Sequence, residues 1–216
     1  TTYYPVKKVH DTFSTDGTGT FSLPEKLPAG IYYFREIKAP AGYLLNGQDI
    51  KFEITKAYDW NRPVSVTCED APAMGKIRIT KTEHEGGNAV PGAVFAIVAA
   101  EDIVTPDGTV RVSKGELVDT VTTGQDGKAM SKALYLGRYA VKETDAPEGY
   151  LLNAKDFETE LKYKDQNTEI VYADIRVENE VAKGKIRIVK TDADTGKIIP
   201  EKAEFEIVAA EDIVTP

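Results

Sequence analysis

Apolar and polar residues alternate along much of this chain. In segment 77–81 the positions of Ile77, Ile79 and Lys81 alternate with polar neighbours, and segments 139–143 and 175–179 show the same period of two. Such runs, bounded by Gly, Pro, Asp and Asn, are typical of strands, and no stretch keeps a helical period for long. The pattern predicts an all-β fold of the sandwich or barrel type.

Several segments of the sequence occur twice. The run GKIRI followed by T or V and then KT, the decapeptide IVAAEDIVTP, and a segment ending in GYLLN each have a second copy. A repeat at a fixed spacing indicates an array of similar structural units. The copies of the first run begin at residues 75 and 184, those of the decapeptide at 97 and 207, and those of the third segment at 33 and 140.

The spacing of these copies defines a repeat of about 109 residues, which is an ordinary size for a sandwich domain. We expect one complete domain at 75–183. Residues 1–74 carry the later part of a second unit, and residues 184–216 carry the first-strand part of a third. The two partial units are complementary, and together they contain nearly one whole repeat.

Three polar residues occupy inward positions of the predicted strands. Lys81 continues the face of Ile77 and Ile79, and Glu143 and Asn179 end the apolar faces of the other two runs. A lone lysine in an apolar core is strongly disfavoured unless it is neutral or paired. The alternation alone leaves another interpretation open, in which each strand ends there and its side chain reaches solvent at the rim.

The motifs around these residues resemble those of a known family. They are I-T-K-T-E with Lys81, P-G-A-V-F from Pro91, Y-x-x-x-E-x-x-A-P-x-G-Y with Glu143, and V-x-N with Asn179. In combination the chain resembles the B-type (CnaB, or SpaA-like) domains of Gram-positive surface adhesins and pilins. The resemblance covers the complete unit and both partial ones. It implies an immunoglobulin-like, prealbumin-like β-sandwich in which Lys and Asn join spontaneously as an isopeptide, assisted by Glu.

The chemistry of that reaction suits these three residue types. Burial disfavours charge, so a neutral amine can coexist with a protonated carboxyl, and a neutral amine is nucleophilic. The resemblance assigns Lys81 as nucleophile, Asn179 as electrophile and Glu143 as the catalytic acid/base. Each molecule reacts once, so we expect autocatalytic maturation without a cofactor and no enzymatic turnover.

The partial units contain equivalent residues, with one difference. Asp replaces Asn, so water instead of ammonia would leave. We expect the tail of one molecule to complete the head of the next, forming a Lys190–Asp70 bond between chains. Cys68 has the inward parity of Asp70, which predicts a small buried hydrophobic residue. The correspondences are Lys190 with Lys81, Glu36 with Glu143, and Asp70 with Asn179.

Composition excludes several classes of function. The net charge of −8 argues against a nucleic-acid partner, and no apolar run approaches the roughly 18 residues of a membrane span. One cysteine excludes an internal disulfide, and two scattered histidines do not suit a zinc site. The segment 192–196 lacks the ligands of a calcium loop and predicts a plain turn.

These observations favour a structural stalk module of an extracellular, cell-wall anchored surface protein, with neighbouring repeats of the same protein as its partners. The alternative is an adhesive binding module whose loops recognise a host protein or glycan. Tyrosines lie mostly in predicted strands or in the Gly-Tyr turns at Tyr43 and Tyr150, which weighs against a binding surface on the loops. An enzyme of metabolism would need a site that no motif supplies.

Overall fold

The computed structural model describes residues 9, 11–55 and 62–212. Its regular elements are all strands, and no helix occurs among these residues. The chain divides into two compact units, one formed by residues 1–36 and 47–68 and the other by residues 37–46 and 69–216. The predicted all-β class is therefore confirmed, and each unit is described by itself.

The first unit is built on an antiparallel hairpin of β1 (Gly30–Arg35) and β2 (Asp49–Ile54). Alternate residues of the hairpin place aromatic rings on one face. The ring of Phe52 lies 5.5 Å from that of Tyr32 and 5.8 Å from that of Phe34. These partly buried rings form a small aromatic cluster on one face of the hairpin.

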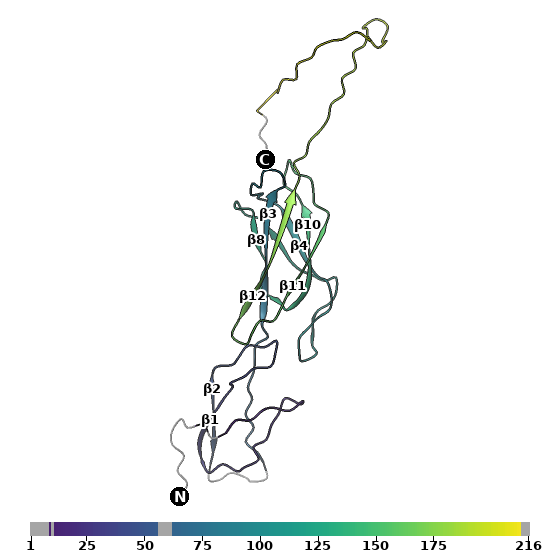
Figure 1. Cartoon of the computed structure of the whole chain (residues 1–216). Coiled ribbons are helices and arrows are strands. Elements are labelled where there is room, and N and C mark those ends of the chain that lie inside the picture. The colour runs from purple at the N-terminus through teal and green to yellow at the C-terminus, as the bar shows by residue number, and fades with distance from the viewer. Residues whose placement is uncertain (1–8, 10, 56–61, 213–216) are drawn as a thin grey trace. The chain divides into compact units, whose positions relative to one another are not determined.

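The second unit contains a complete β-sandwich (Figure 1). One sheet has the order β11-β10-β4-β7, the other has the order β12-β3-β8 with β9 beside the start of β3, and β5 and β6 form a separate ribbon. The bounds are β3 Met74–Glu83, β4 Val94–Ala99, β5 Ile103–Val104, β6 Val110–Val112, β7 Leu117–Thr122, β8 Lys128–Met130, β9 Leu134–Tyr135, β10 Gly137–Asp145, β11 Asp156–Leu161 and β12 Ile170–Asn179.

The first and last strands of the sandwich, β3 and β12, are neighbours and run parallel over their whole lengths. Parallel neighbours need a long crossover connection, which the rest of the domain provides here. Because both strands point the same way, the chain enters the domain at one end and leaves it at the other. The end of β3 and the end of β12 therefore lie side by side.

Both sheets bury alternate side chains between them, as the period of two predicts. Hydroxyl groups inside the core are hydrogen-bonded: Tyr139 donates to the carbonyl oxygen of Tyr135 at 2.7 Å, and Thr123 donates to that of Val90 at 2.8 Å. The fully buried apolar side chains of the central strands include Ile77, Ile79, Phe95, Ile97, Tyr139, Val141 and Val177.

The sequence repeat is visible in the backbone of the two hairpins. Arg35 pairs with Asp49 across β1 and β2, and Lys142 pairs with Asp156 across β10 and β11. Equivalent residues of the two hairpins are 107 positions apart in both strands (35 to 142 and 49 to 156). Each pair also forms an ion pair, at 2.6 Å in the first hairpin and 2.8 Å in the second. The register of the hairpin is thus reproduced as well as its sequence.

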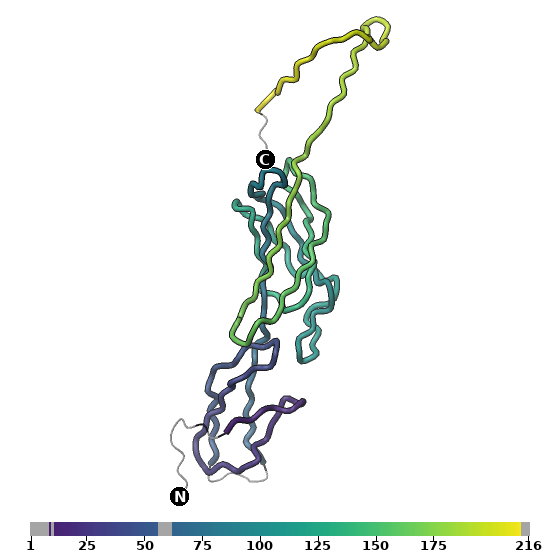
Figure 2. Tube along the Cα trace, in the orientation of Figure 1, coloured from purple at the N-terminus to yellow at the C-terminus, as the bar shows by residue number. Residues whose placement is uncertain are grey.

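The turn that follows Lys81 also occurs twice. Val90 donates its amide to the carbonyl oxygen of Lys81 at 3.1 Å, and Ile199 donates to that of Lys190 at 3.0 Å. Figure 2 shows the segment after Gly184 doubling back on itself at this second turn. Lys190 therefore occupies the same place before a turn as Lys81, at a shift of 109 positions (81 to 190).

Candidate functional site

The complete sandwich buries three polar side chains side by side. Lys81, Glu143 and Asn179 are 0, 5 and 1% exposed. They lie on the inward faces that the alternation predicts, so the alternative in which these side chains reach solvent at the rim is wrong. Burial of this kind is rare for lysine and glutamate unless they are paired.

The strands bring these residues together from both sheets. In the parallel pair, Val177 of β12 lies opposite Lys81 of β3, so Asn179 is the next inward residue beyond it. Glu143 comes from β10 in the facing sheet. Asn179 donates its amide nitrogen Nδ2 to Glu143 Oε1 at 2.8 Å, and Lys81 Nζ lies 3.7 Å from the same oxygen. One carboxyl oxygen therefore faces both nitrogens.

The backbone of Lys81 is held by the turn that follows β7. Lys81 donates its amide to the carbonyl oxygen of Gly127 at 2.7 Å. Gly127 has a φ of +67°, and a Cβ at this residue would lie 2.5 Å from the carbonyl oxygen of Lys81. Only glycine suits such a close approach in this conformation, so the Asp126-Gly127 turn fixes the end of β3.

Two polar atoms of the site have no hydrogen-bond partner among the described residues. They are Lys81 Nζ and Asn179 Oδ1. Buried polar atoms without partners are uncommon in native proteins, because each one costs free energy to remove from water. Burial lowers the pKa of the Lys81 amine from 10.5 to about 8, although the Glu143 carboxylate pulls in the opposite direction. The site therefore holds an amine that deprotonates far more readily than an exposed lysine.

A backbone amide orients the carboxyl group of Glu143. Asn153 donates its main-chain N–H to Glu143 Oε2 at 2.8 Å, which leaves Oε1 for the two side-chain nitrogens. The side chain of Asn153 donates in turn to the carbonyl oxygen of Glu178 at 3.0 Å, beside Asn179. The sequence reasoning missed this role of Asn153. The signal was present in the GYLLN motif, which ends at Asn153 and recurs at Asn46.

Comparison with known proteins identifies the family. A model described as SpaA, prealbumin-like fold domain, matches residues 2–69 and 75–176. The chain belongs to this family. The prediction of a SpaA-like, prealbumin-like sandwich is therefore confirmed.

Individual relatives share only part of their length with this SpaA-family chain. The Trypsin-resistant surface T6 protein of Streptococcus pyogenes serotype M6 is 41% identical over 46 residues, which are 21% of this chain and 9% of that protein. The Bacillus anthracis TIE protein has a structure that is 31% identical with a TM-score of 0.53, over 72% of this chain and 26% of that one. The T6 backbone pilin of S. pyogenes is 15% identical with a TM-score of 0.39, over 51% of this chain and 35% of that one.

The equivalent residues in the partial SpaA-like copies are Asp70, Glu36 and Lys190. Asn46 donates its side-chain nitrogen to the carbonyl oxygen of Glu69 at 3.0 Å, as Asn153 does to Glu178, so Asp70 occupies the position of Asn179. Asp70 Oδ1 is buried without a hydrogen-bond partner in the described structure. Glu36 belongs to the other compact unit, and Lys190 is exposed. No hydrogen bond or ion pair joins Lys190 to Asp70 among the described residues.

The prediction that Cys68 is buried is wrong. Cys68 is exposed, whereas Val177, which the repeat places at the same position, is 0% exposed. The physical reason is that residues 62–68 are assigned to no strand in the described structure, whereas Val177 lies in β12 beside β3. Alternation fixes the buried face of a strand only where a sheet holds that strand in register.

Segment 192–196 forms a turn. The carboxylate of Asp192 accepts hydrogen bonds from the amides of Asp194 and Thr195, at 3.1 and 2.8 Å. Within the described residues no group of three or more His, Cys, Asp or Glu side chains is placed to hold a metal ion. The same residues include no helix long and apolar enough to cross a membrane.

The lowered pKa of Lys81 makes a testable prediction about stability and pH. In the variant Asn179→Leu the amine stays buried and has no electrophile. Its folded pKa, about 8 in the parent, lies below the ordinary value of 10.5. Between these two pH values the unfolded chain binds more protons than the folded one, so the free energy of unfolding should increase as the pH rises from about 8 to about 10.5.

Chemical denaturation of Asn179→Leu across this pH range checks the prediction. The matched control is the double variant Lys81→Met/Asn179→Leu, which lacks the amine and retains the other titrating groups. The difference between the two variants should grow in favour of Asn179→Leu as the pH rises. A difference independent of pH would show that the amine is not desolvated.

Proposed function

We propose that this SpaA-family chain is a structural module of a Gram-positive surface stalk, in which an isopeptide bond between Lys81 and Asn179 locks the first strand to the last. The observation that carries the proposal is the buried amine of Lys81, placed with the amide of Asn179 on one carboxyl oxygen of Glu143. The distances of 3.7 and 2.8 Å to that oxygen support a proton transfer between the two nitrogens.

The reaction needs only these three side chains. The neutral amine of Lys81 attacks Cγ of Asn179, and a bond forms between Nζ and Cγ. Glu143 Oε1 accepts a proton from Nζ and delivers it to Nδ2, the bond between Cγ and Nδ2 breaks, and ammonia leaves. The products are one amide bond and one ammonia molecule, so no oxidant, metal or cofactor takes part. Since Glu143 acts once in each molecule, the domain is not an enzyme.

Burial supports the reaction in two ways. The fold holds amine and amide at the ends of adjacent strands, and such proximity alone can lower a barrier by about 7–11 kcal/mol. Exclusion of water also keeps part of the amine population neutral, since the pKa of Lys81 is lowered to about 8. After bond formation the former amine is an amide nitrogen, which no longer carries a charge. The product thus removes the buried charge that makes the unreacted core costly.

The position of the bond suits a protein under tension. A force applied to the chain enters at the start of β3 and leaves after the end of β12, because the two strands run parallel. A bond from Lys81 to Asn179 would carry that force directly from one strand to the other. The remaining strands of the sandwich would then bear no load. A surface location agrees with the similarity to the surface T6 protein, and neighbouring repeats are the expected partners.

Intact mass tests the bond directly. The purified chain should be lighter than its sequence by one ammonia for the Lys81–Asn179 bond, and tryptic mapping should recover a branched peptide joining these residues. Lys81→Met, Asn179→Leu and Glu143→Ala should each restore the mass of the sequence at this site. Recovery of both residues in linear peptides of the parent protein would contradict the proposal.

The bond should also dominate the stability of the domain. It would close a loop of about 100 residues, which in the chain-entropy model stabilises by about 4–5 kcal/mol. Glu143→Ala should therefore fold, melt well below the parent and become sensitive to protease. Lys81→Met also lacks the bond, but it leaves no buried amine. Its melting temperature should therefore lie between those of Glu143→Ala and the parent. Equal bond formation in Glu143→Ala and the parent would disprove the role of Glu143.

The partial copies extend the proposal to contacts between molecules. Ile186 and Ile188 are 69 and 51% exposed, whereas their equivalents in the complete copy, Ile77 and Ile79, are buried. Residues 184–190 repeat the sequence of a first strand but form no strand in the described structure, so their exposed apolar side chains are available for pairing with strands of another molecule. We propose that the partial unit of a second molecule, residues 1–74, supplies them, with a bond between Lys190 and Asp70 and loss of water. Such a head-to-tail contact propagates into fibres unless it closes into a ring.

A denaturing gel of concentrated protein tests this association. A ladder of covalent multimers should appear, become stronger with protein concentration, and disappear in Lys190→Ala and in Asp70→Ala. Lys185→Ala is the matched control, because it removes an exposed lysine of the same segment whose equivalent, Lys76, lies outside the site. A single monomer band at every concentration would refute the association and leave the bond within the complete domain untouched.

A further inference from the structure

A loop of the preceding repeat is bound to the complete domain. By sequence, residues 39–46 correspond to residues 146–153, the segment that follows β10, and we call these two segments the exit loops. In the first exit loop, Ala39 donates its amide to the side-chain oxygen of Gln166 at 3.0 Å, and Leu45 donates to the carbonyl oxygen of Gln166 at 2.9 Å. Gln166 thus holds both ends of the loop.

The middle of the same exit loop lies against two other parts of the complete domain. Tyr163 donates its hydroxyl to the carbonyl oxygen of Tyr43 at 3.3 Å. Gly42, with a φ of +93°, lies so close to Pro106 that a Cβ would come within 2.6 Å of the proline ring. These contacts all fall within one compact unit. The loop therefore packs against the domain that follows it in the chain.

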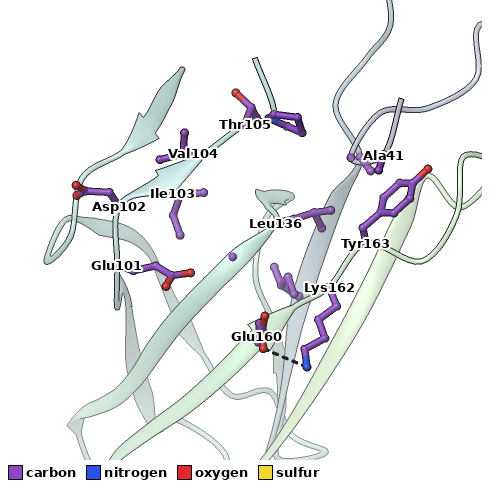
Figure 3. A pocket seen from close by; sticks show the side chains of 15 residues that line it. Ala41, Glu101, Asp102, Ile103, Val104, Thr105, Leu136, Glu160, Lys162 and Tyr163 are labelled. Carbon is purple, nitrogen blue, oxygen red and sulfur yellow. Dashed lines mark ion pairs between the residues drawn. The ribbon is translucent and has the colours of Figure 1, made fainter. Parts of the chain in front are cut away.

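A groove of about 620 Å³ lies along this contact. Figure 3 shows Ala41 of the exit loop beside Tyr163, with Thr105 across the groove and Glu160 and Lys162 at one side. Glu160 and Lys162 are themselves ion-paired at 3.2 Å. Charge on these two side chains is therefore already balanced. The exit loop is held through its own main chain, by the hydrogen bonds to Gln166 and Tyr163 and by the Gly42–Pro106 contact.

The second exit loop has the same sequence pattern, and its side chains are more exposed than those of the first loop in the described structure. Ala39 of the first loop is only 5% exposed, whereas its equivalent, Ala146, is partly exposed. Leu151 and Leu152 are 52 and 50% exposed, although their equivalents, Leu44 and Leu45, are partly buried. The comparison within one chain shows what the contact covers, because the two loops share the sequence pattern Ala-Pro-x-Gly-Tyr-Leu-Leu-Asn.

We infer that the exit loop formed by residues 146–153 is a docking surface for a following repeat of the same kind. The occupant would present its own equivalents of Pro106 and Gln166 to Gly149 and to the amides of Ala146 and Leu152. The sequence of this chain supports that occupant, since the decapeptide that ends in Pro106 recurs without change at 207–216. The inference rests on the proposed stalk function for its use, which is to align successive repeats.

Hydrogen exchange of the full chain, read amide by amide with NMR, tests the seated loop. Gln166→Ala removes the acceptor of the Ala39 amide and retains the backbone acceptor of the Leu45 amide. Exchange at Ala39 should become about threefold to tenfold faster, as expected for the loss of one hydrogen bond. Exchange at Leu45 should change much less. Unchanged exchange at Ala39 would show that the loop is not held by Gln166, and would overturn the inference.

The docking itself is tested by lengthening the chain. Adding a copy of residues 107–183 after Pro216 completes the repeat that begins at Gly184. The amides of Ala146 and Leu152 should then exchange at least about tenfold more slowly, and Gln166→Ala placed only in the added copy should reverse the effect at Ala146. Equal exchange at these amides with and without the added copy would refute the docking surface. Intact mass of the same samples reads the isopeptide bonds separately, so failure of either proposal is recognised by itself.

Discussion

The burial of one amine, that of Lys81, is the constraint on which the rest of this domain depends. A lysine side chain that is 0% exposed and has no hydrogen-bond partner among the described residues is costly, and its lowered pKa expresses that cost. The fold tolerates it because Glu143 reaches across from the facing sheet and Asn179 lies at the end of the adjacent strand. Parallel pairing of β3 with β12, the turn at Gly127 and the amide of Asn153 all serve this arrangement.

The parallel pairing of β3 and β12 also determines how a pulling force would pass through the domain. In an antiparallel pair of terminal strands, both chain ends would leave the domain on the same side, and tension would peel the strands apart bond by bond. Parallel terminal strands place the two ends on opposite sides, and a covalent link between them shortens the path of the force. The proposed link would form without a partner enzyme only if the reacting groups are desolvated first, and the buried amine of Lys81 would meet that requirement.

Alternation predicted the buried face of each central strand and the inward position of Lys81, because both depend only on a period of two. It did not predict the amide of Asn153, since main-chain donors are present at almost every residue and leave no mark in a sequence. It also failed at Cys68, where no sheet holds the segment in register. The family resemblance implied that Lys81 and Asn179 come together, which strand patterns alone do not determine.

The second exit loop, residues 146–153, takes part both in the Glu143 site and in the proposed docking surface. Its last residue, Asn153, orients Glu143 through the main chain, while Leu151 and Leu152 immediately before it form the surface on which the next repeat would dock. A domain that docks there would restrict the backbone that holds the carboxyl group in place. The reverse also holds, because the hydrogen bond from Asn153 to Glu143 limits the conformations available to the docking surface. If both proposals hold, alignment of successive repeats and formation of the bond inside each one would therefore be coupled over a segment of only three residues.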